Sequence, residues 1–210
     1  MKISVWVIYP TFNKKALPPQ MTEQELYEKL AYTDHTREKR DRMAILILDN
    51  PSLIAPLINI ISRVDDAISC RACWILERVV RKDKGLLYPY LDQFTLLLSK
   101  ASLDSAVRPM AKVCELLIIS YYSKTRNHSR NFINGQHLER ITTACFDWLI
   151  GNHKVAAQAY SMTSLQLLGT TFDWIHPELK LILEQNYPTG SAAYKARARM
   201  VLKKIGSSAN

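Results

Sequence analysis

The chain has 210 residues, of which 48% are hydrophobic and 22% charged, and it carries a formal net charge of +9. This composition is typical of a globular domain with a sizeable core and excludes a low-complexity chain. No apolar run reaches the roughly 18 residues of a membrane-spanning helix, so we expect no membrane partner, and the positive charge favours an anionic one.

The first twenty residues differ from the rest of the chain. They contain Pro18 and Pro19, show no helical period, and carry lysines without any acidic residue. The following Thr22-Glu23-Gln24-Glu25 is a capping box, which predicts that the first packed helix begins at Thr22. We therefore expect residues 1–20 to be a disordered or non-native extension, residues 21–206 to form one domain, and residues 207–210 to be a disordered tail.

Apolar residues at a spacing of three and four predict helices along the remainder of the chain, with no strand. Thr33 and Asp34, Asn50 before Pro51, and Asp65 with Asp66 are the expected N-caps, and glycines fall in several joints. Turns of a few residues predict that neighbouring helices are antiparallel. The expected helices span 22–31, 35–48, 51–63, 66–82, 86–100, 104–122, 136–150, 153–169, 173–186 and 190–205.

One helix pattern occurs four times. In each copy small residues fill the first two turns, and Arg71, Arg108, Gln158 and Lys195 take equivalent places, 37, 50 and 37 residues apart. A period of about 34 to 47 residues is typical of α-solenoids built from helix pairs. The longer interval contains the polar, basic stretch 123–136. We interpret it as a surface loop, on a working face or merely solvated.

The second helix of each expected pair resembles HEAT-like repeats. Val107-Arg108-x-x-Ala111 matches the Val-Arg-x-x-Ala core of that family well, and Cys70-Arg71-x-x-Trp74 matches it loosely. The copies at 157–158 and 194–195 lack the Arg. The resemblance implies an all-α, armadillo-like fold: a right-handed α-α superhelix of about five antiparallel helix pairs, whose second helices line a concave face where partners bind.

A second resemblance covers residues 21–205. The segments 65–77, 103–115, 154–162 and 191–199 are similar to a family of short bacterial proteins that are often named adenylosuccinate lyases. The name implies lyase activity. The chain has no segment of the form Gly-Ser-Ser-x-Met-Pro-x-Lys, which the long adenylosuccinate lyases carry. Lyase activity is therefore an alternative without a catalytic motif behind it.

Basic and aromatic residues recur on the second helices at a spacing of three or four. If these helices stack, their side chains form one stripe that binds phosphates and bases, or else an acidic protein surface. The competing interpretation is that the arginines brace the repeats by pairing with Asp66, Glu77, Asp104 or Glu115. The predicted binding residues are Arg71, Trp74, Arg108, Lys112, Tyr160, Tyr194, Lys195 and Arg197.

The triplet Phe-Asp-Trp occurs twice, at 146–148 and 172–174. An aromatic ring beside a carboxylate suggests a base-excision site, and DNA-alkylation-repair glycosylases are HEAT-like, basic and similar in length. A glycosylase with Asp147 or Asp173 as its carboxylate is thus the enzymatic alternative. Because a Trp buries a large area, core or capping packing is the favoured interpretation of Trp148 and Trp174.

The cysteines and histidines give no chemical site. Cys70 and Cys73 have the spacing of a zinc or redox motif, but no second pair of ligands accompanies them. The histidines are scattered, and no nucleophile or phosphate-loop motif is present. We therefore predict a binding module rather than an enzyme, with no cofactor and no metal. Free thiols within apolar helices favour a reducing, cytoplasmic location.

Overall fold

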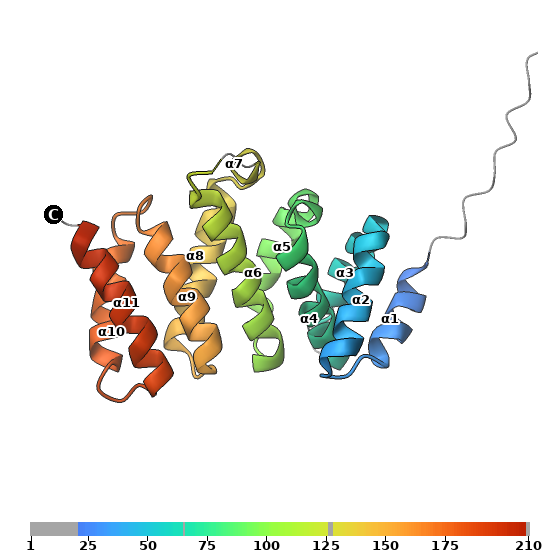
Figure 1. Ribbon diagram of the computed structural model, residues 1–210, viewed down its shortest axis with the longest axis horizontal. Helices are drawn as coiled ribbons and strands as arrows, with labels where there is room; N and C mark the ends of the chain where they lie inside the picture. Colours follow the sequence, from blue (N-terminus) through green and yellow to red (C-terminus); the bar gives the residue numbers. More distant parts are fainter. Residues whose placement is uncertain (1–20, 65, 126–127, 209–210) are drawn as a thin grey trace, which may run out of the picture.

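The computed structural model describes residues 21–64, 66–125 and 128–208 (Figure 1). Over these ranges the chain is all-helical and contains no strand, as predicted. The expected extension at 1–20 and the last two residues of the expected tail lie outside the described part. The α-helices are α1 (Glu23–Ala31), α2 (Arg37–Asp49), α3 (Ile54–Ile61), α4 (Ala67–Lys82), α5 (Leu91–Leu97), α6 (Asp104–Tyr122), α7 (Ser129–Phe132), α8 (Gly135–Ile150), α9 (Val155–Leu168), α10 (Ile175–Asn186) and α11 (Ala192–Ser208), and the 3-10 helices are η1 (Pro51–Leu53), η2 (Gly85–Tyr90) and η3 (Leu98–Lys100).

The longer helices stand side by side in one row. In the order α2, α4, α6, α9, α11, each helix contacts the next, and Figure 1 shows them running across the front of the molecule. Helices α3, α5, α8 and α10 lie behind this row. Among them α3 packs against α4, α8 against α9, and α10 against both α9 and α11. Side chains from helices distant in the sequence therefore come together along the front row.

The start of the helical part follows the predicted capping box. The Glu25 amide donates to the Thr22 hydroxyl at 3.2 Å, and the Glu25 carboxylate accepts from the Thr22 amide at 2.7 Å. Asp66 caps α4 as expected, by accepting from the amide of Ile68 at 2.8 Å. These contacts satisfy amides that the first helical turn leaves without a backbone partner.

Two other expected caps act differently. Asn50 holds both expected positions, as the C-cap of α2 and the N-cap before Pro51, but its side-chain amide donates to the carbonyl of Leu46 at the end of α2 and makes no N-cap hydrogen bond. Asp34 accepts from the amide of Thr36, and the N-cap of α2 is Thr36 rather than Thr33 or Asp34. In both cases the short side chain bonds to the nearest open backbone group, and α2 begins two residues later than expected, at Arg37.

The remaining differences lie at the edges of the predicted helices. The expected helix 86–100 consists of η2, α5 and η3, with Pro89, which has no amide hydrogen, inside η2. The polar stretch 123–136 was predicted as a loop but includes α7. Helix α11 continues to Ser208, beyond the expected helix end at 205 and the expected domain end at 206, so residues 207 and 208 are helical and not part of a disordered tail. The hydroxyl of Ser207 bonds to the carbonyls of Lys203 and Lys204 within that last turn.

One continuous cluster of buried apolar side chains extends from α1 to α11. Each fully buried Leu, Ile or Phe contributes about 1.5–3 kcal/mol relative to an exposed one. The buried side of α4 includes Ala72, Cys73, Leu76 and Val80, whereas Arg71, Trp74 and Arg78 alternate with them and are only partly buried. The core therefore determines which side of α4 presents its basic residues.

Candidate functional site

Glu77 on α4 is a buried carboxylate that joins two helices. Its side chain is only 7% exposed, so its charge needs partners. The guanidinium of Arg81, one turn along the same helix, donates to Oε1 at 2.7 and 3.1 Å. Arg108 from α6 donates to the other oxygen at 3.0 Å. One carboxylate thus holds two arginines in place and ties α4 to α6.

Glu115 has the same role further along the row. Its side chain is 4% exposed, and one oxygen accepts a hydrogen bond from Lys112, three residues earlier on α6. The guanidinium of Arg197, from α11, lies 3.9 Å from the other oxygen. Arg197 also donates to the hydroxyl of Thr163 on α9 at 2.6 Å. Side chains from α6, α9 and α11 therefore meet at this point.

The row of charges extends to α2 at the other end. Asp41 on α2 pairs with Arg78 of α4, and the guanidinium of Arg40 lies 5.9 Å from the centre of the Trp74 ring. Burial lowers the pKa of Arg40, and repulsion from Arg78 and Arg108 lowers it further. These arginines are therefore close enough to act on one another.

We call this arrangement the cation row. It crosses α2, α4, α6 and α11, and α9 contributes Thr163 and Tyr160 between the charges. The carboxylates that it contains are Asp41, Glu77 and Glu115, so the cations outnumber them and the row has a positive surplus. Its cations are Arg40, Arg78, Arg81, Arg108, Lys112 and Arg197.

Among the predicted binding residues, Arg108, Lys112 and Arg197 belong to this row. The competing bracing interpretation is also met in part, since Arg108 pairs with Glu77. Trp74 and Tyr160 lie in the row, but their rings are already in contact with cations. Lys112 Nζ is 4.6 Å from the centre of the Tyr160 ring, and the Trp74 indole N–H donates to the carbonyl of Ser105 at 2.8 Å.

Arg71 bonds to backbone carbonyl groups instead of to a carboxylate. Its guanidinium donates to the carbonyl oxygens of Leu30, at 3.3 Å, and Ala31, at the end of α1. A cation at this position satisfies carbonyls that the last helical turn leaves open and interacts favourably with the helix dipole. Arg71 thus fastens α1 to α4, whereas the bracing interpretation had expected it to pair with an acidic side chain.

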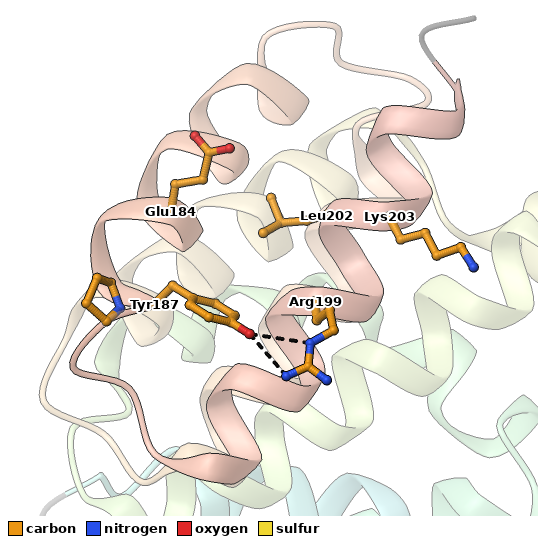
Figure 2. Close-up of a pocket in the computed structure, with 6 residues that line it drawn as sticks. Glu184, Tyr187, Arg199, Leu202 and Lys203 are labelled. Atoms are coloured by element: carbon orange, nitrogen blue, oxygen red, sulfur yellow. Dashed lines mark hydrogen bonds between the residues drawn. The ribbon is translucent and has the colours of Figure 1, made fainter.

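The predictions for α11 need correction. Tyr194 is 4% exposed, so its ring belongs to the core and not to a binding face. Lys195 lies over the ring of Tyr187, 6.0 Å from its centre. The same ring lines a pocket of about 510 Å³ between α10 and α11 (Figure 2), where Arg199 donates to the Tyr187 hydroxyl at 3.1 and 3.4 Å. Arg197, two residues after Lys195, is the α11 residue that reaches the row.

Comparison with known proteins gives no identification. No protein-family model, no curated protein and no solved structure matches the chain. Over the described residues no single helix is long and apolar enough to cross a membrane; α2 taken together with the segment Pro51–Ile61 meets the same criteria, although the two are bent by 110°.

The aromatic residues of the two Phe-Asp-Trp triplets lie apart from the cation row, on α8 and just before α10. Trp148 is buried, as core packing would require, whereas Trp174 is 56% exposed and its ring stacks on Phe146 with centres 5.4 Å apart. Helices α8 and α10 stand behind the front row in Figure 1. Asp147 and Asp173 are exposed on these rear elements, so no contact places either carboxylate beside the row's arginines.

The cysteines are packing residues with poor nucleophilicity. All four are buried as free thiols. Burial raises the pKa of Cys145 to about 12 and also raises that of Cys73, which disfavours the reactive thiolate at both positions. The Cys70 sulfur accepts a hydrogen bond from Ser105 at 3.1 Å. Within the described residues, no group of His, Cys, Asp and Glu side chains has the geometry of a metal site.

Sequence reasoning missed Arg40 and Arg81, and it treated Glu77 and Glu115 only as possible braces. A usable signal was present. On α4, Glu77 lies between Leu76 and Val79, at a position that the apolar pattern predicts to be buried. A carboxylate at such a position requires cationic partners. The Arg at i+4 is one of them, and a cation from the neighbouring helix is the other.

Proposed function

We propose that this chain is a HEAT-like helical-repeat binding module whose cation row receives an acidic segment of a protein partner. In this proposal the helices pair as α1 with α2, α3 with α4, α5 with α6, α8 with α9, and α10 with α11, as a right-handed superhelix. The second helices of these pairs are the ones that carry the row. The sequential contacts from α2 to α11 support such an array.

The observation that carries the proposal is the positive surplus of the row. If bracing were the row's whole role, cations and carboxylates would be expected to balance. Here Glu77 and Glu115 each serve two cations, and burial, together with repulsion from Arg78 and Arg108, lowers the pKa of Arg40. An external carboxylate close to these groups would relieve that repulsion and gain charge-assisted hydrogen bonds.

The contacts favour an acidic protein segment over single-stranded nucleic acid. Base recognition of that kind uses aromatic faces on which bases stack. In the row, the Tyr160 ring is in contact with Lys112, Trp74 lies under Arg40, and Tyr194 is buried. Carboxylates need no open ring and match the fork of an arginine side chain.

The test compares two labelled probes by fluorescence anisotropy: a glutamate-rich peptide and a DNA oligonucleotide of mixed sequence, each with salt titration. We expect the peptide to bind, with an affinity that falls as salt rises. The double variant Arg108→Gln/Arg197→Gln should weaken binding on the order of tenfold, since partly exposed ion pairs contribute about 0.5–1 kcal/mol each. Both carboxylates keep one partner in this variant, Arg81 for Glu77 and Lys112 for Glu115.

The matched control is Arg42→Gln/Lys180→Gln, which removes the same charge at exposed positions of α2 and α10 that lie outside the row. It should leave peptide affinity nearly unchanged. Equal losses in the two double variants would mean that net charge alone drives binding and would refute the row as a site. Tight DNA binding with a salt slope that Arg108→Gln reduces by about one would assign the row to nucleic acid instead.

A further inference from the structure

A second feature lies at the C-terminal ends of α4 and α6, two of the helices that carry the cation row. A pocket of about 620 Å³ opens between the ends of α4 and α6. Its apolar part comes from α6 and from the 3-10 helix η2, and basic side chains stand at its rim. The lining includes Lys82, Lys84, Tyr88, Leu116, Ile119 and His128.

The floor of the pocket continues the row along the same face of α6. Arg108, Lys112, Leu116 and Ile119 follow one another at intervals of four, four and three residues, so they lie on one side of the helix. From Arg108 to Ile119 the helix rises by roughly 16 Å. Leu116 is half-buried and Ile119 is 45% exposed, which is unusual for an Ile whose neighbours on the helix pack into the core.

Contacts hold the wall of the pocket in place. The Tyr88 ring stacks on Phe132 of α7, with centres 4.8 Å apart, and the Tyr88 hydroxyl bonds to the Ser129 hydroxyl at 2.6 Å. The hydroxyls of Ser120 and Ser129 are 2.5 Å apart. The basic insertion, which the repeat period leaves unexplained, thus anchors Tyr88 beside the apolar floor.

We infer that this pocket receives one large apolar side chain of the same acidic segment that the cation row binds, an inference that rests on the proposed function. The pocket and the row share one face of α6, and Lys82 and Lys84 line the pocket, with Asp83 as the acidic neighbour. In an extended partner, the roughly 16 Å between the pocket and Arg108 correspond to about five residues.

Charge argues against two other occupants. The first twenty residues of this chain include apolar side chains, but their charged residues are Lys2, Lys14 and Lys15. A second copy of the chain would bring another net charge of +9 to a basic rim. Both would meet repulsion that an acidic segment avoids.

Two matched peptides test the inference. Both are fluorescein-labelled and glutamate-rich; one has a leucine about five residues from its acidic centre, and the other has serine there. The leucine peptide should bind the unaltered chain about tenfold more tightly, the lower end of what burial of a leucine side chain gives. Ile119→Asn should remove this preference and leave the serine peptide's affinity unchanged.

The outcomes separate the two proposals. If both peptides bind the unaltered chain equally, the pocket inference is wrong and the cation row stands. If neither peptide binds, both are wrong. The double variant Arg108→Gln/Arg197→Gln should weaken the binding of both peptides by the same factor and preserve the preference for leucine. A loss of that preference would contradict the assignment of the acidic residues to the cation row and of the leucine to the pocket. Circular dichroism of Ile119→Asn controls for folding.

Discussion

Two junctions between neighbouring helices, α4 with α6 and α9 with α10, are held by different means. Long charged side chains span the first: Glu77 on α4 bonds to Arg108 on α6. The second is held by a histidine ring that packs closely against a glycine. A Cβ added to Gly169, at the end of α9, would lie 2.0 Å from the His176 ring. That ring donates a hydrogen bond from Nε2 to the carbonyl of Gln166 at 2.9 Å.

The difference teaches that a regular series of helices does not require regular chemistry at its joints. A long, partly exposed ion pair tolerates small shifts of the helices, because its side chains can adjust. A ring that packs on a glycine and is held by a hydrogen bond has less freedom to adjust, because an added methyl group must displace it. We therefore expect the C-terminal junction to be the more sensitive to mutation.

The largest expected effect is at that junction. Gly169→Ala should destabilise the chain by about 3 kcal/mol, since overpacking costs about 1–3 kcal/mol and the displaced His176 also loses its hydrogen bond, worth about 1 kcal/mol. Urea unfolding followed by circular dichroism measures the change. The backbone itself is no obstacle, because Gly169 has an ordinary helical φ of −63°.

Gly135→Ala is the matched control. A Cβ there would meet no atom within 4 Å, and the residue begins α8. We expect the free energy of unfolding to stay the same or to rise by about 0.4–1 kcal/mol, because alanine restricts the unfolded chain. Similar losses at both glycines would show that backbone freedom, and not close approach, makes Gly169 necessary.

The next effect concerns the buried carboxylates. Glu77→Ala leaves Arg81 and Arg108 without their shared partner and should cost about 2 kcal/mol, less than for a fully buried pair because both arginines are partly exposed. Glu115→Ala should lower the free energy of unfolding by about 1 kcal/mol, since Lys112 keeps its cation–π contact with the ring of Tyr160. The free energies of unfolding in urea decide the order. A larger loss for Glu115→Ala would contradict it.

The helices and the side of each one that packs inward follow from the sequence. Apolar spacing and the capping box locate α1 and α4 within a residue or so, and the three- and four-residue spacing of Trp74, Arg78 and Arg81 marks the outer side of α4. These features depend on near neighbours in the chain. Local geometry decides them, and a single sequence contains that information.

The partners of the basic residues could not be predicted in the same way. Whether Arg108 reaches Glu77, and whether Arg197 or Lys195 joins the row, depends on how far adjacent helices are shifted and rotated against each other. The burial of Tyr194 was predictable, because Ala198, Val201 and Ile205 follow it at helical spacing and all are buried. Alignment of Lys195 with Arg71 by the repeat pattern obscured that signal.

Double-mutant cycles compare the two carboxylates directly. The Glu77–Arg108 pair, at 3.0 Å, should show a coupling energy of about 1 kcal/mol. The Glu115–Arg197 pair, at 3.9 Å, should show less than about 0.5 kcal/mol, because Arg197 keeps the Thr163 hydroxyl. Alanine single and double variants in urea give both values. Equal couplings would indicate that the row is one network and not two unequal centres.

The smallest expected effect lies at the contact between α1 and the start of α4, where the Tyr27 hydroxyl donates to Asp66 at 2.6 Å. This hydrogen bond, together with that from the Ile68 amide, lowers the pKa of Asp66. A lowered folded-state pKa of Asp66 stabilises the fold at pH values above the unfolded-state pKa, about 4, and this stabilisation is lost as the pH falls through the folded-state pKa.

Tyr27→Phe should therefore lower the urea midpoint slightly at pH 7 and by less below pH about 4. Tyr32→Phe, at an exposed position beyond α1, should show no such pH dependence. A constant difference for Tyr27→Phe between the two pH values would mean that ring packing, and not the hydrogen bond to Asp66, links α1 to α4.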